Sequence, residues 1–311
     1  MGGSGGGYFE DRSPKNIQDD LRKEEQATDT QVFETKVSTE IASLLTEYND
    51  RDTSAVTTAI DTLRKALESE IEDVSINPVF GGSVRKHTYV NGISDIDSLF
   101  VLKGEGLARE KPGVVLDHFE EALRVKLPAC NIERDNIALG VTINGLKIEI
   151  LPAVRQGNKL AISSVSGEQW SRISPEAFFR KLSEVNARQG SKVVPCIKMV
   201  KGVIDGFPES HKLRGYHVES LAIEAFKGYR GPQNTKAMIE HFFTSASERV
   251  LQPIRDKSGQ SLHVDGYAGS KNSETRRLMS QSLDRVARRI KNANASQSVD
   301  HWMRILDQES E

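Results

Sequence analysis

Two aspartates separated by one residue, Asp95 and Asp97, lie within an apolar run that reads ISDIDSLFVL from Ile93 to Leu102. In an extended strand, side chains two residues apart point to the same face, so both carboxylates would project together. An apolar strand solvates two repelling carboxylates poorly. A divalent cation such as Mg²⁺ resolves the conflict, because it prefers oxygen ligands and also binds phosphate oxygens. The pair therefore predicts a strand here with a cation beside it.

A glycine-rich turn, Gly81-Gly82-Ser83, precedes the first of these aspartates, with eleven residues between them. Glycines permit a tight turn whose backbone N–H groups can approach a phosphate closely. Taken alone, such a turn is more often an ordinary turn, and an Asp-x-Asp pair is more often a solvated strand edge. Their order and the strand context together favour phosphoryl or nucleotidyl transfer with two metal ions.

A third carboxylate, Glu149, lies on the second strand of a predicted hairpin. The dipeptide Asn144-Gly145 between two alternating apolar segments is the strongest short-range hairpin signal. On the second strand, Glu149 shares a face with Lys147. The residues alone leave two interpretations open. Either Glu149 completes a metal site beside the strand of the two aspartates, or it is a surface residue paired with Lys147.

The rest of the chain is predicted to be mainly helical, with helices over 31–48 and 54–71 before the glycine turn and more helices from residue 174 onward. Lys198 and Lys201 lie three residues apart on one of these later helices, and a phosphate-binding role requires one of them to face the cleft. Tyr216, near a helix start, either stacks on a base or packs between domains.

The predicted organisation has three parts. Residues 1–30, rich in glycine and charge, form a mobile N-terminus. Residues 31–172 form the sheet-containing core together with the two N-terminal helices. Residues 173–311 form a helical domain that closes the nucleotide cleft.

Composition argues against several other classes of protein. The net charge of −2 over 311 residues gives no global basic character of the kind that dedicated nucleic-acid binders have. No apolar run is long enough to span a membrane and no signal-peptide pattern occurs, so a cytoplasmic protein is expected. Two cysteines without a C-x-x-C motif predict neither a disulfide framework nor zinc. A run over 271–291 has seven basic residues against two acidic ones, and is either a solvated helix face or a phosphate or partner contact.

Several of these segments resemble a known superfamily. The pieces Gly82-Ser83, Ser94-Asp95-Ile96-Asp97 and Glu149-Ile150-Leu151-Pro152-Ala153 look like the three-part signature of the DNA polymerase β-type nucleotidyltransferases. CIKMVKGVI (Cys196 to Ile204) and GYHVESL (Gly215 to Leu221) are similar to helices of cyclic GMP-AMP synthase and of the bacterial cGAS/DncV-like nucleotidyltransferases. The similarity extends over residues 80 to 230 and more weakly to residue 295.

The resemblance implies an α+β fold. A polymerase β-like nucleotidyltransferase core, a mixed sheet with flanking helices, would pack against a C-terminal helical bundle. It also implies an enzyme that joins ribonucleoside triphosphates into a cyclic di- or trinucleotide second messenger. In bacteria such a product acts on a separate effector in anti-phage (CBASS) signalling.

The resemblance assigns roles to seven residues. The catalytic and metal-binding residues would be Asp95, Asp97 and Glu149, around two Mg²⁺ ions or, as a substitute, Mn²⁺. The nucleotide-binding residues would be Gly82 and Ser83 at the donor triphosphate, Lys198 at its phosphates, and Tyr216 on a base. The sequence departs from many relatives at Glu149, where they have Asp, and the longer side chain could shift the metal while preserving its ligand chemistry.

Partners and alternatives follow from the same comparison. The cyclic GMP-AMP synthase of animals grips DNA with the help of a zinc-binding insertion. No His/Cys cluster occurs here, so DNA activation by that route is not expected, whereas a regulatory protein partner stays open. One alternative is a template-independent nucleotidyltransferase acting on RNA, a protein or a small molecule, against which the chain lacks an obvious extra RNA-binding domain. The other is a catalytically silent binding protein of the same fold, against which the three carboxylates are intact.

Overall fold

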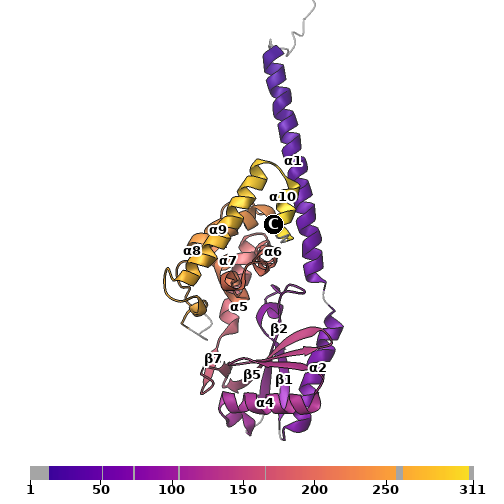
Figure 1. Ribbon diagram of the computed structural model, residues 1–311, viewed down its shortest axis with the longest axis vertical. Helices are drawn as coiled ribbons and strands as arrows, with labels where there is room; N and C mark the ends of the chain where they lie inside the picture. Colours follow the sequence, from indigo (N-terminus) through magenta and orange to yellow (C-terminus); the bar gives the residue numbers. More distant parts are fainter. Residues whose placement is uncertain are drawn as a thin grey trace, which may run out of the picture.

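The computed structural model describes residues 14–50, 52–72, 74–103, 106–164, 166–256 and 262–307. A mixed sheet with its covering helices forms one layer, and a bundle of helices forms the other (Figure 1). The prediction of an α+β fold with a mixed sheet packed against a C-terminal helical bundle is confirmed. Residues 1–13, which belong to the N-terminus predicted to be mobile, lie outside the described residues.

Among the described residues, seven strands form one sheet. They are β1 (Ser75–Phe80), β2 (Ile96–Lys103), β3 (Asn131–Arg134), β4 (Leu139–Ile143), β5 (Leu146–Gln156), β6 (Lys159–Ser163) and β7 (Trp170–Ile173). The spatial order is β1-β2-β5-β4-β3, and β6 pairs with both β5 and β7. β2 and β5 run parallel and the other pairs antiparallel. The long β5 therefore lies beside β2 over the stretch that begins with the predicted site.

Helices cover one face of this sheet. The helices of the sheet layer are α2 (Thr53–Glu70), the short α3 (Gly82–Arg85) and α4 (Pro112–Lys126). Ile96 and Phe100 of β2 are buried in one core with α2 and α4. Leu99 belongs to a smaller cluster on the opposite face. Because side chains alternate along a strand, Asp97 shares the face of Leu99 and points away from the α2/α4 core.

The helical layer has its own core. Its helices are α5 (Pro175–Arg188), α6 (Val193–Asp205), α7 (Gly215–Phe226), α8 (Thr235–Arg249), α9 (Glu274–Ala295) and α10 (Val299–Leu306). Phe226, Phe242 and Trp302, from three of these helices, are fully buried in it. The helical layer is therefore held by apolar packing of its own and meets the sheet layer at a separate junction.

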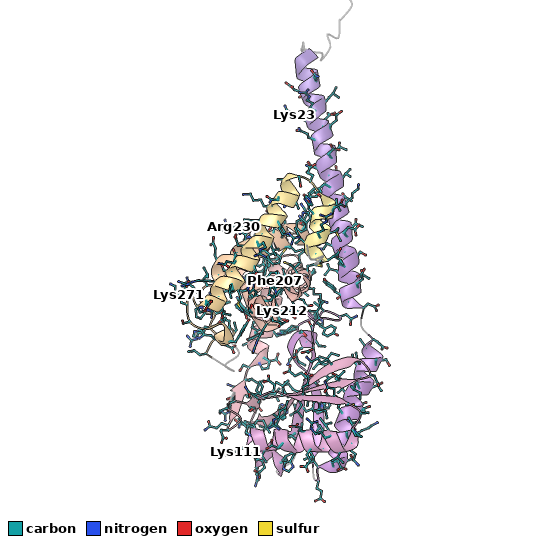
Figure 2. All side chains as sticks on the ribbon, in the orientation of Figure 1. Lys23, Lys111, Phe207, Lys212, Arg230 and Lys271 are labelled. Carbon is teal, nitrogen blue, oxygen red and sulfur yellow. The ribbon has the colours of Figure 1, made fainter. Side chains whose placement is uncertain are left out.

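The N-terminal helix α1 (Pro14–Asn49) differs from its prediction in length and in its packing partner. Its apolar stripe Phe33, Val37 and Ile41 is buried in the core of the helical layer, on α6, α8 and α10. Both N-terminal helices were predicted to belong with the sheet, but of the two only α2 packs against the sheet. Residues 14–30, assigned to the mobile N-terminus, continue the helix beyond the bundle (Figure 1), and Figure 2 shows Lys23 projecting from that part.

The predicted hairpin is confirmed. β4 and β5 are joined by Asn144 and Gly145, whose φ angles are 51° and 78°. Positive φ at both central residues is what a two-residue turn between twisted antiparallel strands requires. The helix predicted over 54–71 corresponds to α2, whose N-cap is Asp52. No helix in the described part of the chain combines the length and apolarity needed to cross a membrane.

Candidate active site

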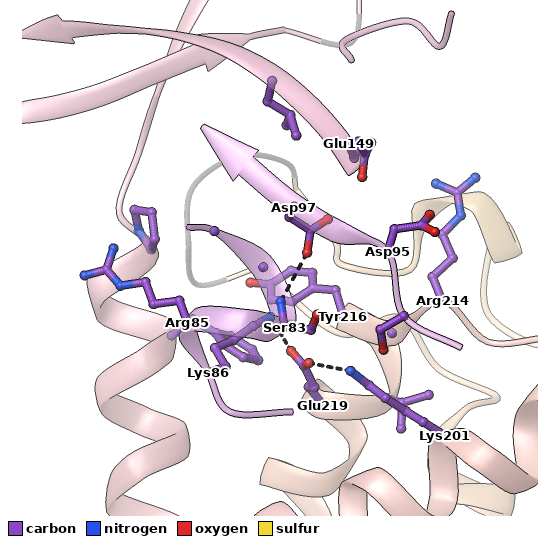
Figure 3. Close-up of a pocket in the computed structure, with 18 of the residues that line it drawn as sticks. Ser83, Arg85, Lys86, Asp95, Asp97, Glu149, Lys201, Arg214, Tyr216 and Glu219 are labelled. Carbon is purple, nitrogen blue, oxygen red and sulfur yellow. Dashed lines mark hydrogen bonds and ion pairs between the residues drawn. The ribbon is translucent and has the colours of Figure 1, made fainter. Parts of the chain in front are cut away.

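A cavity of about 700 Å³ lies at the junction of the two layers. The sheet layer contributes the glycine turn, the loop before β2 and the ends of β2 and β5, and the helical layer contributes α5, α6 and α7 (Figure 3). Its polar lining includes Ser83, Arg85, Lys86, Asp95, Asp97, Glu149, Lys201, Arg214, Tyr216 and Glu219. Six of the seven residues given roles by the sequence resemblance line this cavity; Lys198 does not.

Two of the carboxylates are placed by the pairing of β2 with β5. Asp97 and Glu149 are register partners in these parallel strands, and both side chains line the cavity. Asp95 immediately precedes β2, and its Oδ2 lies 3.6 Å from Lys147 Nζ. Lys147 thus pairs with Asp95, and the interpretation of Glu149 as a surface residue paired with Lys147 is not the arrangement found. The sheet itself brings the three acids together.

The acids repel one another in a poorly solvated place. Burial raises the pKa of Glu149 to about 8, and the charge of Asp97 and a hydrogen bond with it add to the shift. Burial also raises the pKa of Asp95, against the opposing attraction of Lys147. Such shifts mean that negative charge on this wall of the cavity is under-compensated by the protein.

The glycine turn is built against Asp97. Asp97 Oδ2 accepts a hydrogen bond from the Ser83 backbone N–H at 3.1 Å, and the Asp97 carbonyl accepts one from Gly81 N at 3.0 Å. Gly82 has φ +43°, and a Cβ there would lie 1.5 Å from Asp97 Oδ2, so no other residue fits without displacing the carboxylate. The Ser83 hydroxyl is buried and has no hydrogen-bond partner among the described residues. The turn therefore presents an unused polar group beside the acids.

These residues fit a divalent cation in chemistry. Three carboxylates supply the hard oxygen ligands that Mg²⁺ and Mn²⁺ take, and the raised pKa of Glu149 reflects a lack of positive charge beside it. Within the described ranges, however, no three His, Cys, Asp or Glu side chains already form a metal-binding group. Asp97 is engaged by the turn and Asp95 by Lys147. Side-chain rotation from these partners would be needed to gather the oxygens.

Of the two lysines predicted three residues apart on one helix, Lys201 faces the cavity and Lys198 does not. Lys198 Nζ donates to Asn49 Oδ1 at the end of α1. Lys201, one helical turn later, lines the cavity and is 6% exposed. Lys201 therefore meets the condition that one of the two lysines must face the cleft. Lys198 does not line the cavity, and its contact with phosphates stays a prediction.

Tyr216 lies at the cavity wall and also packs between elements of the fold. Its ring lines the cavity and packs on Phe178, with centroids 4.6 Å apart and planes tilted by 53°. Its hydroxyl donates to Asp256 Oδ1 at 3.0 Å. Lys86 Nζ lies 5.0 Å from the ring centroid. The tyrosine is thus held between elements at the cavity wall, and stacking on a base stays a prediction.

Glu219 of α7, which joins the two layers, is a residue of the cavity to which no sequence pattern assigned a role. Only 1% exposed, its carboxylate accepts from Lys86 Nζ, from Thr88 Oγ1 and from Lys201 Nζ, the last at 2.9 Å. Burial alone would raise the pKa of Glu219, but the charges of Lys201 and Lys86 outweigh it and hold the pKa at about 2. A signal existed, since Glu219 interrupts an apolar helix whose neighbours Val218 and Leu221 are both buried.

The basic run over 271–291 lies apart from this cavity. Most of it belongs to α9, and none of its residues lines the cavity. Figure 2 places Lys271 at the outer side of the helical layer. Arg276 is fully buried and its Nη1 donates to Asp265 Oδ2 at 2.6 Å, so this member of the run has a structural partner.

Comparison with known proteins agrees with this geometry. Residues 36–186 match the family Second Messenger Oligonucleotide or Dinucleotide Synthetase domain (SMODS). A search of curated proteins finds no match.

Solved structures share the fold across most of both chains. The E. coli MS115-1 CdnC:HORMA-deltaN complex has a TM-score of 0.66 at 13% identity, covering 88% of this chain and 97% of that one. Bradyrhizobium diazoefficiens CdnG with GTP has a TM-score of 0.64 at 13% identity, covering 82% and 89%. Vibrio cholerae DncV cyclic AMP-GMP synthase, with the linear intermediate pppA(3′,5′)pG, has a TM-score of 0.60 at 12% identity, covering 94% and 88%. The resemblance seen in the sequence is confirmed at the level of the fold: residues 36–186 match the model of that synthetase domain, and the chain has the fold of the cGAS/DncV-like nucleotidyltransferases.

Proposed function

We propose that this protein is a nucleotidyltransferase that joins ribonucleoside triphosphates into a cyclic oligonucleotide. The observation that carries the proposal is the direct pairing of Asp97 with Glu149 across β2 and β5, with Asp95 beside them, in a cavity whose lining also includes Lys86 and Lys201. Acids along one wall and ammonium groups along another suit a substrate that carries both metal-binding and free phosphate oxygens. The relatives CdnG, with GTP, and DncV, with a linear dinucleotide, support this class of substrate.

The chain's own residues have separable tasks in this proposal. Lys201 and Lys86 bind phosphate oxygens of the triphosphate, and Lys201 takes the role first assigned to Lys198. Gly82 allows the turn to approach the phosphates, and the unpartnered Ser83 hydroxyl donates to one of them. Tyr216 presents its ring to a base from the wall of the cavity. Together they place the α-phosphate beside the three acids.

Asp95, Asp97 and Glu149 would hold two Mg²⁺ ions, or Mn²⁺. When bound, the ions would lower the pKa of the attacking hydroxyl and stabilise charge on the phosphate oxygens. In the reaction a ribose hydroxyl oxygen forms a bond to the α-phosphorus, the bond from that phosphorus to the bridging oxygen of the β-phosphate breaks, and pyrophosphate leaves. A second transfer of the same kind, within the linear product, closes the ring.

The biological setting is proposed on the same basis. The cyclic product would act on a separate effector in bacterial anti-phage signalling, and the helical domain of residues 173–311 would close over the nucleotides. CdnC was solved in complex with HORMA-deltaN. That complex supports a regulatory protein partner for this chain as well.

A direct test incubates the full chain with four labelled ribonucleoside triphosphates and Mg²⁺ or Mn²⁺, beside an Asp95→Ala/Asp97→Ala control. Products are treated with phosphatase and resolved by mass spectrometry. The expected result is a phosphatase-resistant cyclic product that the control does not make. Linear additions to supplied RNA would instead identify a template-independent polymerase. A protein that binds the triphosphates but turns none over, with each metal and in a cell extract, would be a silent relative.

A further inference from the structure

Glu219 makes more contacts than one buried ion pair would. Three donors converge on its carboxylate, and they come from both layers of the molecule. Figure 3 shows two of them, Lys86 and Lys201. Lys86 and Thr88 belong to the sheet layer, just after α3, whereas Lys201 lies on α6. Lys201 Nζ also donates to the Thr88 carbonyl at 3.0 Å. The carboxylate is thus the shared acceptor at which the glycine-turn segment meets the helical layer.

This placement gives the segment over 81–88 two anchors. At its start, Gly81 and Ser83 donate to Asp97. At its end, Thr88 N donates to the Ser83 carbonyl at 2.9 Å, and the Thr88 hydroxyl donates to Glu219. The turn therefore lies between an acid of the sheet and an acid of the helical layer. Movement of either anchor would move the Ser83 hydroxyl and the Lys86 ammonium group.

The lysines depend on Glu219 for their orientation. A lysine side chain has four rotatable bonds and loses conformational entropy when it is fixed, so an ammonium group keeps one position only if something holds it. Lys86 is 13% exposed and also lies 5.1 Å from the ring centroid of Phe178. With Lys86 and Lys201 on one carboxylate, the group carries a net charge of +1. One positive charge thus remains uncompensated beside the cavity.

We propose that Glu219 is a positioning residue, which aims Lys86 and Lys201 at the triphosphate and makes nucleotide binding depend on the contact between the two layers. The inference rests on the proposed function, since it assigns the lysines to phosphate. Glu219 itself touches no substrate. Its role is to hold the two ammonium groups and the end of the glycine turn in one arrangement.

A simple electrostatic role predicts the opposite result from a positioning role. Glu219→Gln changes the group from net +1 to net +2, which by charge alone would attract a triphosphate more strongly. A glutamine also has one acceptor oxygen and an NH₂ that would face an ammonium group, so the lysines would lose their shared acceptor. If positioning dominates, the variant binds the triphosphate more weakly in spite of its added charge.

The experiment measures binding by calorimetry on the full chain with Mg²⁺ and an ATP analogue whose α,β-bridging oxygen is a methylene, so that no transfer occurs. Adenosine monophosphate serves as the comparison ligand. The variants are Glu219→Gln, Glu219→Asp as a partial rescue, and Thr88→Val, which removes one donor and is the milder change. Glu224→Gln is the matched control, because Glu224 lies on the same helix, is exposed and does not line the cavity.

Glu219→Gln is expected to weaken binding of the triphosphate analogue about tenfold to a hundredfold, and to change monophosphate binding far less. Thr88→Val should cost about threefold, Glu219→Asp should restore part of the loss, and Glu224→Gln should match the wild type. Equal or tighter triphosphate binding by Glu219→Gln overturns the inference. If Glu219→Gln does not fold, unchanged binding by Thr88→Val overturns it. A wild type that binds no triphosphate overturns the proposed function instead.

Discussion

Glu149 is half-buried and Glu219 is fully buried, and both line one cavity, yet the pKa values of their carboxyl groups are shifted in opposite directions. Burial raises the pKa of Glu149 to about 8, and the negative charges of its neighbours Asp97 and Asp95 add to the shift. For Glu219, the charges of Lys201 and Lys86 more than offset burial and hold the pKa at about 2. Cationic side chains pair with Glu219 at one wall of the cavity, whereas the neighbours of Glu149 at the other wall are acids.

The difference indicates what each wall is built to receive. The Glu219 carboxylate is already paired with two lysines, which leave that wall with a net positive charge. The wall of Glu149 has three acids and one cationic partner, Lys147, whose pairing is with Asp95. A carboxylate cluster that the protein leaves under-compensated costs stability and is characteristic of functional sites. The same substitution at each glutamate should therefore have different consequences.

The largest effect is expected from Glu149→Gln on catalysis. The change keeps size and removes a proposed metal ligand, so we expect product formation to fall about a thousandfold or more. The variant should stay folded and, without metal at pH 8 to 9, unfold at an equal or higher temperature than the wild type, because a repelled carboxylate is gone. Calorimetric melting and product assays on one preparation test both statements. Unchanged turnover would remove Glu149 from the site.

The corresponding substitution at Glu219 should lower the free energy of unfolding. Glu219→Gln leaves two lysines without their shared carboxylate, and breaking a buried ion pair by removing one partner costs about 3–5 kcal/mol. Urea unfolding of the wild type and the variant gives the free-energy difference directly. A loss below about 1 kcal/mol would mean that Glu219 contributes no more than a surface ion pair.

The two glutamates also predict opposite pH dependences of the free energy of unfolding, measured without divalent ions. Glu149 has a raised pKa, so the folded state holds its proton more tightly and stability falls as pH rises from about 4.5 to about 8. Glu219 has a lowered pKa, so its contribution is full above about 4.5 and is lost as pH falls toward 2. Each effect amounts to a few kcal/mol. Subtracting the unfolding curve of Glu149→Gln should isolate the first slope, and a flat difference would refute it.

Gly82→Ala tests how closely the turn is built against the carboxylate wall. The new Cβ would overlap Asp97 Oδ2, and the positive φ adds backbone strain, so we expect a loss of about 2–3 kcal/mol in unfolding free energy together with reduced activity. Gly228→Ala is the matched control, since a Cβ there meets nothing within 4 Å. Equal stability of the two variants would contradict the close contact.

The smallest effect on triphosphate affinity is expected for a substitution of Lys198, and it should be compared with the same substitution of Lys201. Lys198→Gln should change triphosphate affinity less than about twofold, because its ammonium group is engaged at Asn49, whereas Lys201→Gln should weaken affinity about tenfold. Calorimetry with the methylene analogue compares them. A larger effect at Lys198 would return the phosphate contact to the residue that the resemblance first indicated.

The parts of the fold that the sequence predicted correctly depend on short-range patterns. Asn144-Gly145 specifies its turn through two positive φ angles, and the alternation of β5 places Glu149 on one face whatever its neighbours are. That β5 lies beside β2 was an inference from the resemblance as much as from the residues. The pattern of acids therefore located one wall of the cavity.

The residues of the lysine wall could not be predicted from the sequence, because their positions depend on long-range packing. Lys198 and Lys201 lie about 60° apart around a helix, and α6 is buried over most of its surface, so its pattern does not say which side meets the cavity. Glu219 finds its donors 133 and 131 residues away, at Lys86 and Thr88. The polar first half of α1 likewise has no apolar period from which a helix could be predicted.

The central claim is that the acidic wall receives metal and the lysine wall receives phosphate. Its most direct test is a crystal structure of the full chain with Mn²⁺ and the methylene ATP analogue, using the anomalous signal of manganese. We predict Mn²⁺ peaks within bonding distance of Asp97 and Glu149, and the triphosphate between these peaks and Lys201. Nucleotide bound without Mn²⁺ at these carboxylates, or with its phosphates away from Lys86 and Lys201, would contradict the account.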